Sequence, residues 1–160
     1  MGILFSASEV VQMGIQIEQN GKDYYITVAK SARENKTKEA FQYLAAEEEK
    51  HIRTFEDILS QIEKYEPPES YPGEYFAYLR ALSEEYVFTK ARKGEEIAGK
   101  VKSDREAIET GIGFEKDSIL FYEEMKNLVG QGAHQTIDKL IEQEKEHLRK
   151  LSQLKSSLQV

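Results

Sequence analysis

Two stretches of the sequence place a glutamate three residues before a histidine, a spacing that suits a metal site. AAEEEKH contains Glu48 and His51, and EQEKEH contains Glu144 and His147. Residues three apart lie on one face of an α-helix, so each pair could share one metal ion. In LIEQEKEHLRKL, leucine and isoleucine repeat on the same face as Glu144 and His147. This pattern predicts that a carboxylate and an imidazole point into the core, where both are costly to bury without a partner.

The two halves of the chain repeat the same special residues at the same steps. The repeated spacing of 4, 3 and 4 residues joins Gly14, Glu18, Gly21 and Tyr25 in the first half, and Gly111, Glu115, Ser118 and Tyr122 in the second. Glu18 lies 30 residues before Glu48, and Glu115 lies 29 residues before Glu144. At about 1.5 Å of rise per residue, two antiparallel hairpins would bring these glutamates to a similar depth. We therefore expect four glutamates and two histidines to meet near the middle of the protein.

Four buried carboxylates in one place repel one another unless protons or cations compensate them. Two divalent ions would balance four carboxylates while both histidines stay neutral as ligands. Carboxylate and imidazole donors together suit iron, manganese or zinc. Because glutamate is abundant, one Glu-x-x-His match is weak evidence, and the repeat in both halves strengthens it.

Other polar residues near these motifs are expected to have ordinary roles. His134, in the turn GAHQT, and the flanking Glu47 and Glu49 should lie at the surface or form ion pairs. Tyr25 and Tyr122 lie two helical turns after Glu18 and Glu115, where they could fill the core, hydrogen-bond to a metal ligand or take part in redox chemistry.

These residues must be positioned by helices, since the apolar pattern is helical throughout. We predict an all-α, four-helix bundle whose long helices span about 6–33, 38–64, 103–128 and 133–158. SASE and SDRE offer capping boxes, Ser6 with Glu9 and Ser103 with Glu106, at two helix starts. The short turns make two antiparallel hairpins (1–64 and 103–160), and a crossover (65–102) with a short helix at about 75–91 joins them in a single domain, 1–160.

Composition excludes several classes of function. The 160 residues carry a net charge of -7, which argues against nucleic acid or an anionic membrane as the main partner. The absence of cysteine rules out disulfides, thiolate nucleophiles and thiolate metal sites. The first residues, MGILFSASEVV, resemble neither a signal peptide nor an anchor, and no apolar run is long enough to span a membrane, so we expect a cytoplasmic protein.

At its motifs the sequence resembles the rubrerythrin branch of the ferritin-like superfamily, in the form of a stand-alone di-iron domain. The matching stretches are IEQNGKDYY, AAEEEKH, FEKDSILFYEEM and IEQEKEHLRKL, which cover nearly the whole chain except the crossover. The resemblance implies a ferritin-like bundle with two iron ions, or zinc or manganese in the protein as purified. It also implies that the metals react with dioxygen or hydrogen peroxide.

Carried over by position, the resemblance gives each of the six residues a metal role. Glu48 and Glu144 would bridge the two metals. Glu18 with His51 would complete one metal site, and Glu115 with His147 would complete the other. Tyr25 and Tyr122 would lie in the shell around these ligands.

The sequence departs from the rubrerythrin pattern in two respects. The rubredoxin domain and its four cysteines are missing, so electrons would come from a separate, rubredoxin-type donor. Rubrerythrins carry an additional glutamate on the third long helix, one turn after the first ligand. Here Ser118 occupies that position, and Gly21 is its counterpart in the first half. The six-ligand set is therefore nearer to that of bacterioferritin-type centres.

Three functions remain open on this basis. The first is an oxidoreductase, peroxidase- or oxidase-like, that protects against oxidative stress and acts as a homodimer or small homo-oligomer. The second is iron oxidation for storage or metal buffering, which would require a hollow ferritin-type shell. The third is a binding or scaffold module that contains zinc or no metal.

Overall fold

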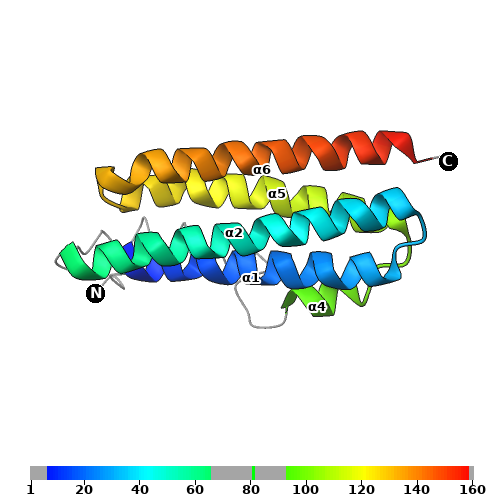
Figure 1. Ribbon diagram of the computed structural model, residues 1–160, viewed down its shortest axis with the longest axis horizontal. Coiled ribbons are helices and arrows are strands. Elements are labelled where there is room, and N and C mark those ends of the chain that lie inside the picture. The colour runs from blue at the N-terminus through cyan, green and yellow to red at the C-terminus, as the bar shows by residue number, and fades with distance from the viewer. Residues whose placement is uncertain (1–6, 66–80, 82–92, 159–160) are drawn as a thin grey trace.

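The computed structural model describes residues 7–65, 81 and 93–158 of the chain. Its long helices are α1 (Ala7–Ser31), α2 (Asn35–Tyr65), α5 (Asp104–Leu128) and α6 (Gln131–Ser157), and α4 (Lys93–Ala98) is a short helix. Figure 1 shows the four long helices side by side along the longest axis of the molecule. The described residues contain no strand, and the predicted all-α bundle of two hairpins is confirmed.

Specific contacts cap the start of α5 and join it to the α1–α2 turn. Ser103 caps α5 by accepting a hydrogen bond from the Glu106 backbone N–H (3.1 Å), and the Glu106 carboxylate accepts one from the Lys102 backbone N–H (3.0 Å). The predicted N-cap at Ser103 is therefore present, but the reciprocal bond of a capping box goes to the N–H of residue 102 instead of that of Ser103. Ser6 lies outside the described residues. The Asp104 carboxylate accepts hydrogen bonds from the backbone N–H groups of residues 33 and 34 in the α1–α2 turn. This contact fixes the first hairpin against the start of the second.

The core lies between the inward faces of the four long helices. Its largest fully buried side chains include Phe41, Phe55 and Phe121, together with Leu44 and Met125. Burying a side chain of this kind stabilises the fold by about 1.5–3 kcal/mol. The sequence pattern of apolar and charged residues thus correctly predicts which face of each long helix is buried.

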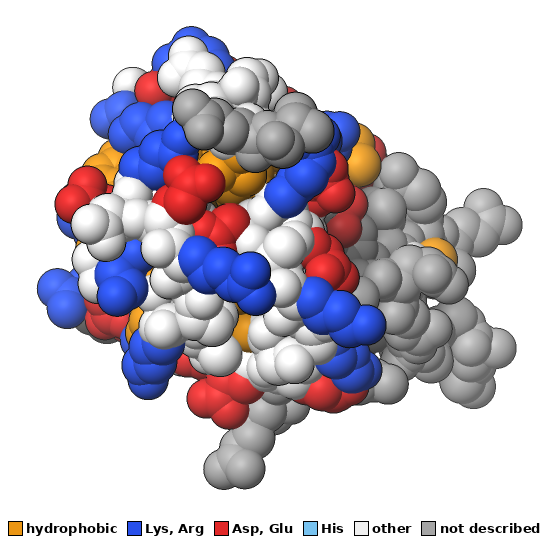
Figure 2. Space-filling view, turned by 90° about the vertical axis from the view of Figure 1, so that its right-hand side faces the viewer, with side chains coloured by type: hydrophobic (Ala, Val, Ile, Leu, Met, Phe, Trp, Pro, Cys, Tyr) orange, Lys and Arg blue, Asp and Glu red, His pale blue; other side chains and the backbone are white. Residues whose placement is uncertain are grey.

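The end of the bundle that carries the α1–α2 turn and the end of α6 is strongly charged. Figure 2 shows lysine, arginine, aspartate and glutamate side chains intermixed there, with small hydrophobic patches between them.

Among the described residues, no helix is both long and apolar enough to cross a membrane.

The crossover differs from the prediction where the structure describes it. The short helix expected at 75–91 lies outside the described residues apart from Ala81, which is helical. The rest of the crossover, for which no helix was predicted, contains α4. A Cβ atom on Gly94 would lie 2.0 Å from the Asn20 backbone oxygen, so only glycine lets α4 approach α1 this closely. Tertiary contact, rather than local periodicity, therefore accounts for this helix.

The ends of the long helices differ from the prediction by up to three residues. The second long helix begins at Asn35 instead of residue 38, and the last begins at Gln131 instead of residue 133. Differences of this size are normal where helix ends fray. The single domain over 1–160 and its crossover (65–102) stay predictions.

Candidate metal centre

The six predicted residues all lie inside the bundle, although each carries a polar or ionisable group. Their side chains come from all four long helices: Glu18 on α1, Glu48 and His51 on α2, Glu115 on α5, and Glu144 and His147 on α6. Each is 4% exposed or less. Burial of four carboxylates and two imidazoles at one level is costly unless other groups compensate their charge.

Four of the six residues form a compact cluster at the α2–α6 contact. Ligand atoms of Glu48, His51, Glu144 and His147 all lie within 4.8 Å of one another. The two histidine rings are stacked, with centroids 5.3 Å apart and an interplanar angle of 18°. The two Glu-x-x-His motifs therefore face each other, as their repeat in the sequence predicts.

The two remaining glutamates extend this cluster on opposite sides. A Glu18 oxygen lies 3.3 Å from Nδ1 of His51, and a Glu115 oxygen lies 3.7 Å from Nδ1 of His147. This arrangement pairs Glu18 with His51 and Glu115 with His147, as the family resemblance implies. The structure thus brings all six residues together, and their roles as ligands stay a prediction.

Glu48 and Glu144 each lie close to both histidines. Oxygens of Glu144 are 2.9 Å from Nδ1 of His51 and 3.1 Å from Nδ1 of His147. The corresponding distances for Glu48 are 3.6 and 3.8 Å. Each of these carboxylates therefore reaches both halves of the centre, which is the position that a bridging ligand requires.

Each half of the protein holds a carboxylate of the other half through a tyrosine. The Tyr25 hydroxyl on α1 donates a hydrogen bond to Glu115 on α5, and the Tyr122 hydroxyl on α5 donates one to Glu18 on α1. Burial and the neighbouring carboxylates raise the pKa values of both tyrosines, so both remain protonated donors. Of the roles considered for these tyrosines, hydrogen bonding to the cluster and core filling are both observed, and a redox role stays a prediction.

The metal-free cluster distributes its charge unevenly. Burial, followed by the charges of neighbouring glutamates, raises the pKa values of Glu48 and Glu144 well above their ordinary range. Burial acts in the same direction on Glu18, but contact with Glu48 and the charge of His51 outweigh it and lower the pKa of Glu18 to about 2. The pKa of His51 is raised by Glu144 and Glu18 against the opposing effect of burial. Without metal, the cluster therefore holds several protons to limit repulsion between carboxylates.

Several polar atoms at the centre have no hydrogen-bond partner. They are Oε2 of Glu18, Oε1 of Glu144 and both ring nitrogens of His51. The short distance between Nδ1 of His51 and Glu144 does not have the geometry of a hydrogen bond, although the two groups attract each other electrostatically. Unpartnered buried polar atoms are rare in native proteins and call for an explanation. Atoms of this kind converging from three helices fit a bound cation, with the oxygen- and nitrogen-rich ligand set that iron, manganese or zinc accepts.

A small cavity adjoins the centre where the additional rubrerythrin glutamate is missing. It has a volume of about 10 Å³, and its lining includes Gly21, Ser118, Tyr25, Glu48 and Glu115. This volume is close to the smallest that holds one water molecule. A Cβ atom on Gly21 would lie 3.7 Å from Glu48, which is ordinary contact. Packing therefore does not require glycine at this position, and the absence of a side chain keeps the cavity open.

The residues expected to lie apart from the centre do so. Glu47 forms an ion pair with Lys50 (2.5 Å), and Glu49 forms one with Lys22 (2.7 Å). His134 lies in the first turn of α6, where its Nε2 is 3.1 Å from the Val129 backbone carbonyl oxygen. None of these three belongs to the buried cluster, and the prediction of ordinary roles is confirmed.

Sequence reasoning missed Tyr43, which contacts the centre from outside. Its ring packs edge-on against His147 with centroids 6.4 Å apart, and it is 43% exposed. Nζ of Lys150 lies 3.9 Å from the centroid of the same ring. Neither Tyr43 nor Lys150 belongs to the repeat shared by the two halves, so the sequence pattern gave no signal for this contact.

Comparison with known proteins agrees with this centre. A crystal structure of a Thermotoga maritima protein assigned to the ferritin-like diiron-carboxylate proteins matches with a TM-score of 0.75 and 29% identity, covering 98% of this chain and 99% of that one. No curated protein sequence gives a significant match. The sequence model of the Rubrerythrin family matches residues 9–155. With its helical bundle and its buried glutamate–histidine cluster, this chain belongs to the Rubrerythrin family.

Proposed function

We propose that the protein is a di-iron oxidoreductase that reduces hydrogen peroxide or dioxygen with electrons from a separate donor. The observation that carries this proposal is the buried cluster of four glutamates and two histidines, two of whose carboxylates reach both histidines. Family membership and the match to a ferritin-like diiron-carboxylate protein support iron as the metal. When bound, two ferrous ions would supply the two electrons that, with two protons, convert hydrogen peroxide into two water molecules.

The six residues of the cluster would hold the metals by the pairing seen in their geometry. Glu18 and His51 would bind one ion, and Glu115 and His147 the other. Glu48 and Glu144 would bridge the two ions, as the proximity of each carboxylate to both histidines supports. Four carboxylates at -4 balance two divalent ions at +4, so the loaded centre would be neutral inside the bundle.

The residues around the cluster would orient the ligands and limit access. Tyr25 and Tyr122 would fix Glu115 and Glu18 by hydrogen bonds, the kind of outer contact that commonly tunes a metal ligand. The cavity beside Gly21 and Ser118 has room for about one water molecule, which favours a very small oxidant over an organic substrate. The missing thiolates mean that a separate protein, such as a rubredoxin-type donor, would return the electrons.

Rapid mixing of the anaerobic, iron-loaded protein with one oxidant at a time tests this proposal. We expect one hydrogen peroxide to be consumed for every two ferrous ions oxidised, and oxidation faster than that of the same iron free in buffer. Glu115→Gln should lose this reaction, whereas Glu123→Gln, on the exposed face of the same helix, should retain it. Oxidation no faster than in buffer would contradict the enzymatic proposal.

The same preparation separates enzyme from storage protein. A homodimer or small homo-oligomer that binds two irons per chain supports the oxidoreductase. A large hollow assembly that deposits many irons per chain would replace it with ferritin-type storage.

A further inference from the structure

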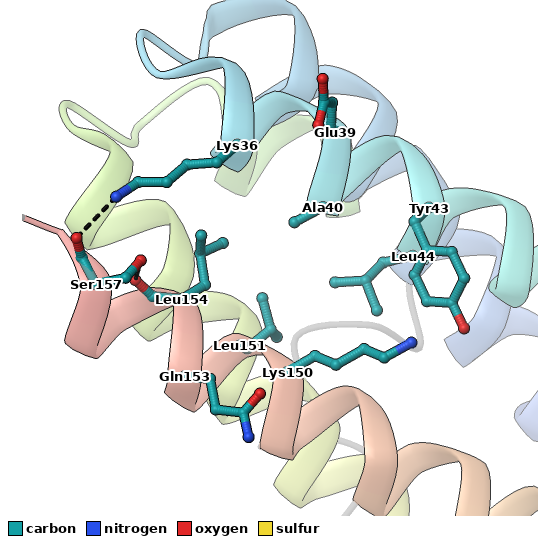
Figure 3. Close-up of a pocket in the computed structure, with 10 residues that line it drawn as sticks. All are labelled: Lys36, Glu39, Ala40, Tyr43, Leu44, Lys150, Leu151, Gln153, Leu154 and Ser157. Carbon is teal, nitrogen blue, oxygen red and sulfur yellow. Dashed lines mark hydrogen bonds between the residues drawn. The ribbon is translucent and has the colours of Figure 1, made fainter.

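A groove between α2 and α6 lies outside the metal centre and has no role in the proposed reaction (Figure 3). Its volume is about 590 Å³, within the range of about 300–1,000 Å³ typical of sites for small organic molecules. The groove runs beside the end of the bundle where α2 begins and α6 ends. Its size and position make it a candidate site for a second ligand.

The floor of the groove is apolar. Figure 3 shows the side chains of Ala40 and Leu44 on α2 facing those of Leu151 and Leu154 on α6. Leu44 and Leu151 are buried in the core, and the other two are half-buried. An apolar molecule lying on this floor would remove further hydrocarbon surface from water, a contribution of about 25 cal/mol per Å².

Each end of the groove carries a lysine, and the two lysines differ in their partners. At one end, Lys36 donates a hydrogen bond to the Ser157 carbonyl oxygen (2.7 Å) and lies 3.2 Å from Glu34, so its ammonium group is already engaged. At the other end, Lys150 rests on the ring of Tyr43. In the described ranges, no carboxylate forms an ion pair with Lys150, whose cation–π contact leaves its N–H donors available.

The one acidic residue that lines the groove lies away from this end. Figure 3 shows Glu39 beyond Ala40, on the opposite side of the groove from Lys150. An anionic group beside Lys150 would therefore meet a cation, and no second acidic residue lines the groove. The charge of Lys150 favours a ligand with an acidic group at one end, and the leucine floor favours a ligand whose remainder is apolar.

We propose that this groove binds a small amphipathic anion, with its apolar body over Leu44 and Leu151 and its acidic head on Lys150. The inference does not depend on the proposed oxidoreductase activity, because none of the lining residues is a predicted metal ligand. The site selects a carboxylate, sulfonate or similar head on a hydrocarbon or aromatic body of modest size.

Two fluorescent probes that differ in charge test the proposal on the full-length, metal-loaded protein. The anionic probe is 8-anilinonaphthalene-1-sulfonate, and the neutral one is N-phenyl-1-naphthylamine. Lys150→Ala should weaken binding of the anionic probe about tenfold or more, by loss of a charge-assisted contact, and leave the neutral probe almost unaffected. Ala40→Trp should fill the groove and abolish binding of both.

Lys139→Ala serves as the matched control, since it removes an exposed lysine from the same helix about three turns away. It should change neither affinity. Circular dichroism and metal content verify that each variant is folded, and Lys150 is exposed, so its replacement does not threaten the core. Unchanged affinity for the anionic probe in Lys150→Ala, or in a folded Ala40→Trp, overturns the proposal. It is also overturned if the wild type self-associates at the probe concentrations and Ala40→Trp makes it monomeric, because a second copy then occupies the groove.

Discussion

Replacing Glu144 by glutamine should affect the metal-loaded and the metal-free protein in opposite directions. The substitution keeps the size of the side chain and removes the negative charge that lies 2.9 Å from His51 and 3.1 Å from His147. Two unit charges about 4 Å apart attract each other by about 4 kcal/mol at the effective dielectric constant of about 20 that suits protein sites, which is a conservative figure for a divalent ion. Each 1.4 kcal/mol corresponds to a factor of ten, so the affinity for the second metal should fall about a thousandfold.

The metal-free protein should respond differently to the same change. Burial and the charges of Glu18 and Glu115 raise the pKa of Glu144, which favours the neutral form of this carboxyl in the metal-free protein. Glutamine resembles a protonated glutamate in shape and charge. The free energy of unfolding without metal should therefore stay unchanged or increase. The increase should be clearest above neutral pH, where ionisation of Glu144 destabilises the wild type.

Anaerobic titration calorimetry with ferrous ion and chemical denaturation in the presence of a chelator measure the two effects. Glu142→Gln is the control, because Glu142 lies on the same helix but is exposed, with Lys145 as its partner. We expect one metal or none per chain in Glu144→Gln and two in the control. If Glu144→Gln binds two ions with wild-type affinity, or if its metal-free form is strongly destabilised, the assignment of Glu144 as a charge-balancing bridge is refuted.

Three further predictions concern the surroundings of the centre. Tyr122→Phe should lower the metal affinity about 10–100-fold without abolishing it, because the Glu18 carboxylate loses its hydrogen-bond donor. Unchanged affinity in a metal titration would mean that Tyr122 contributes only to packing. Gly94→Ala should lower the free energy of unfolding by about 1–3 kcal/mol, because the new Cβ atom forces α4 away from α1. Gly99→Ala is the control and should be tolerated, since its Cβ atom would lie 3.5 Å from its nearest neighbours. Equal denaturation midpoints of the two variants would contradict this packing. The chelated protein should lose stability as the pH rises above about 5. The pKa values of Glu48 and Glu144 are raised in the folded state, so both carboxyls stabilise the fold in full below the ordinary carboxyl pKa, and this contribution is lost as the pH rises through the folded pKa. The loss is about 1.4 kcal/mol per pH unit for each proton released. Melting temperatures of chelated and metal-loaded protein between pH 5 and 8 should diverge, and parallel curves would count against the effect.

Periodicity and internal repetition predict most of the fold and all six residues of the buried cluster. Glu144 and His147 share a helical face with core leucines, so their burial follows from local geometry once the helix is predicted. Their convergence with Glu48 and His51 follows from the similar spacing of the two hairpins, because equal lengths of helix reach equal depths. These inferences require only distances along the chain.

Features that depend on contact between distant segments could not be predicted in the same way. The exchange of hydrogen bonds, Tyr25 to Glu115 and Tyr122 to Glu18, depends on which helices are neighbours and on side-chain rotamers. The helix at Lys93–Ala98 is too short to show a period and forms where Gly94 can pack on α1. The groove beside Tyr43 arises between two helices that are far apart in the sequence, and no pattern within either helix indicates it.

Anomalous X-ray diffraction at the iron absorption edge, on crystals of protein reconstituted with ferrous iron, tests the central claim most directly. We predict two anomalous peaks inside the bundle, one beside Glu18 and His51 and the other beside Glu115 and His147, with Glu48 and Glu144 between them. An absence of peaks in the cluster, while iron is present in the crystal, would contradict a di-iron centre and the chemistry proposed for it.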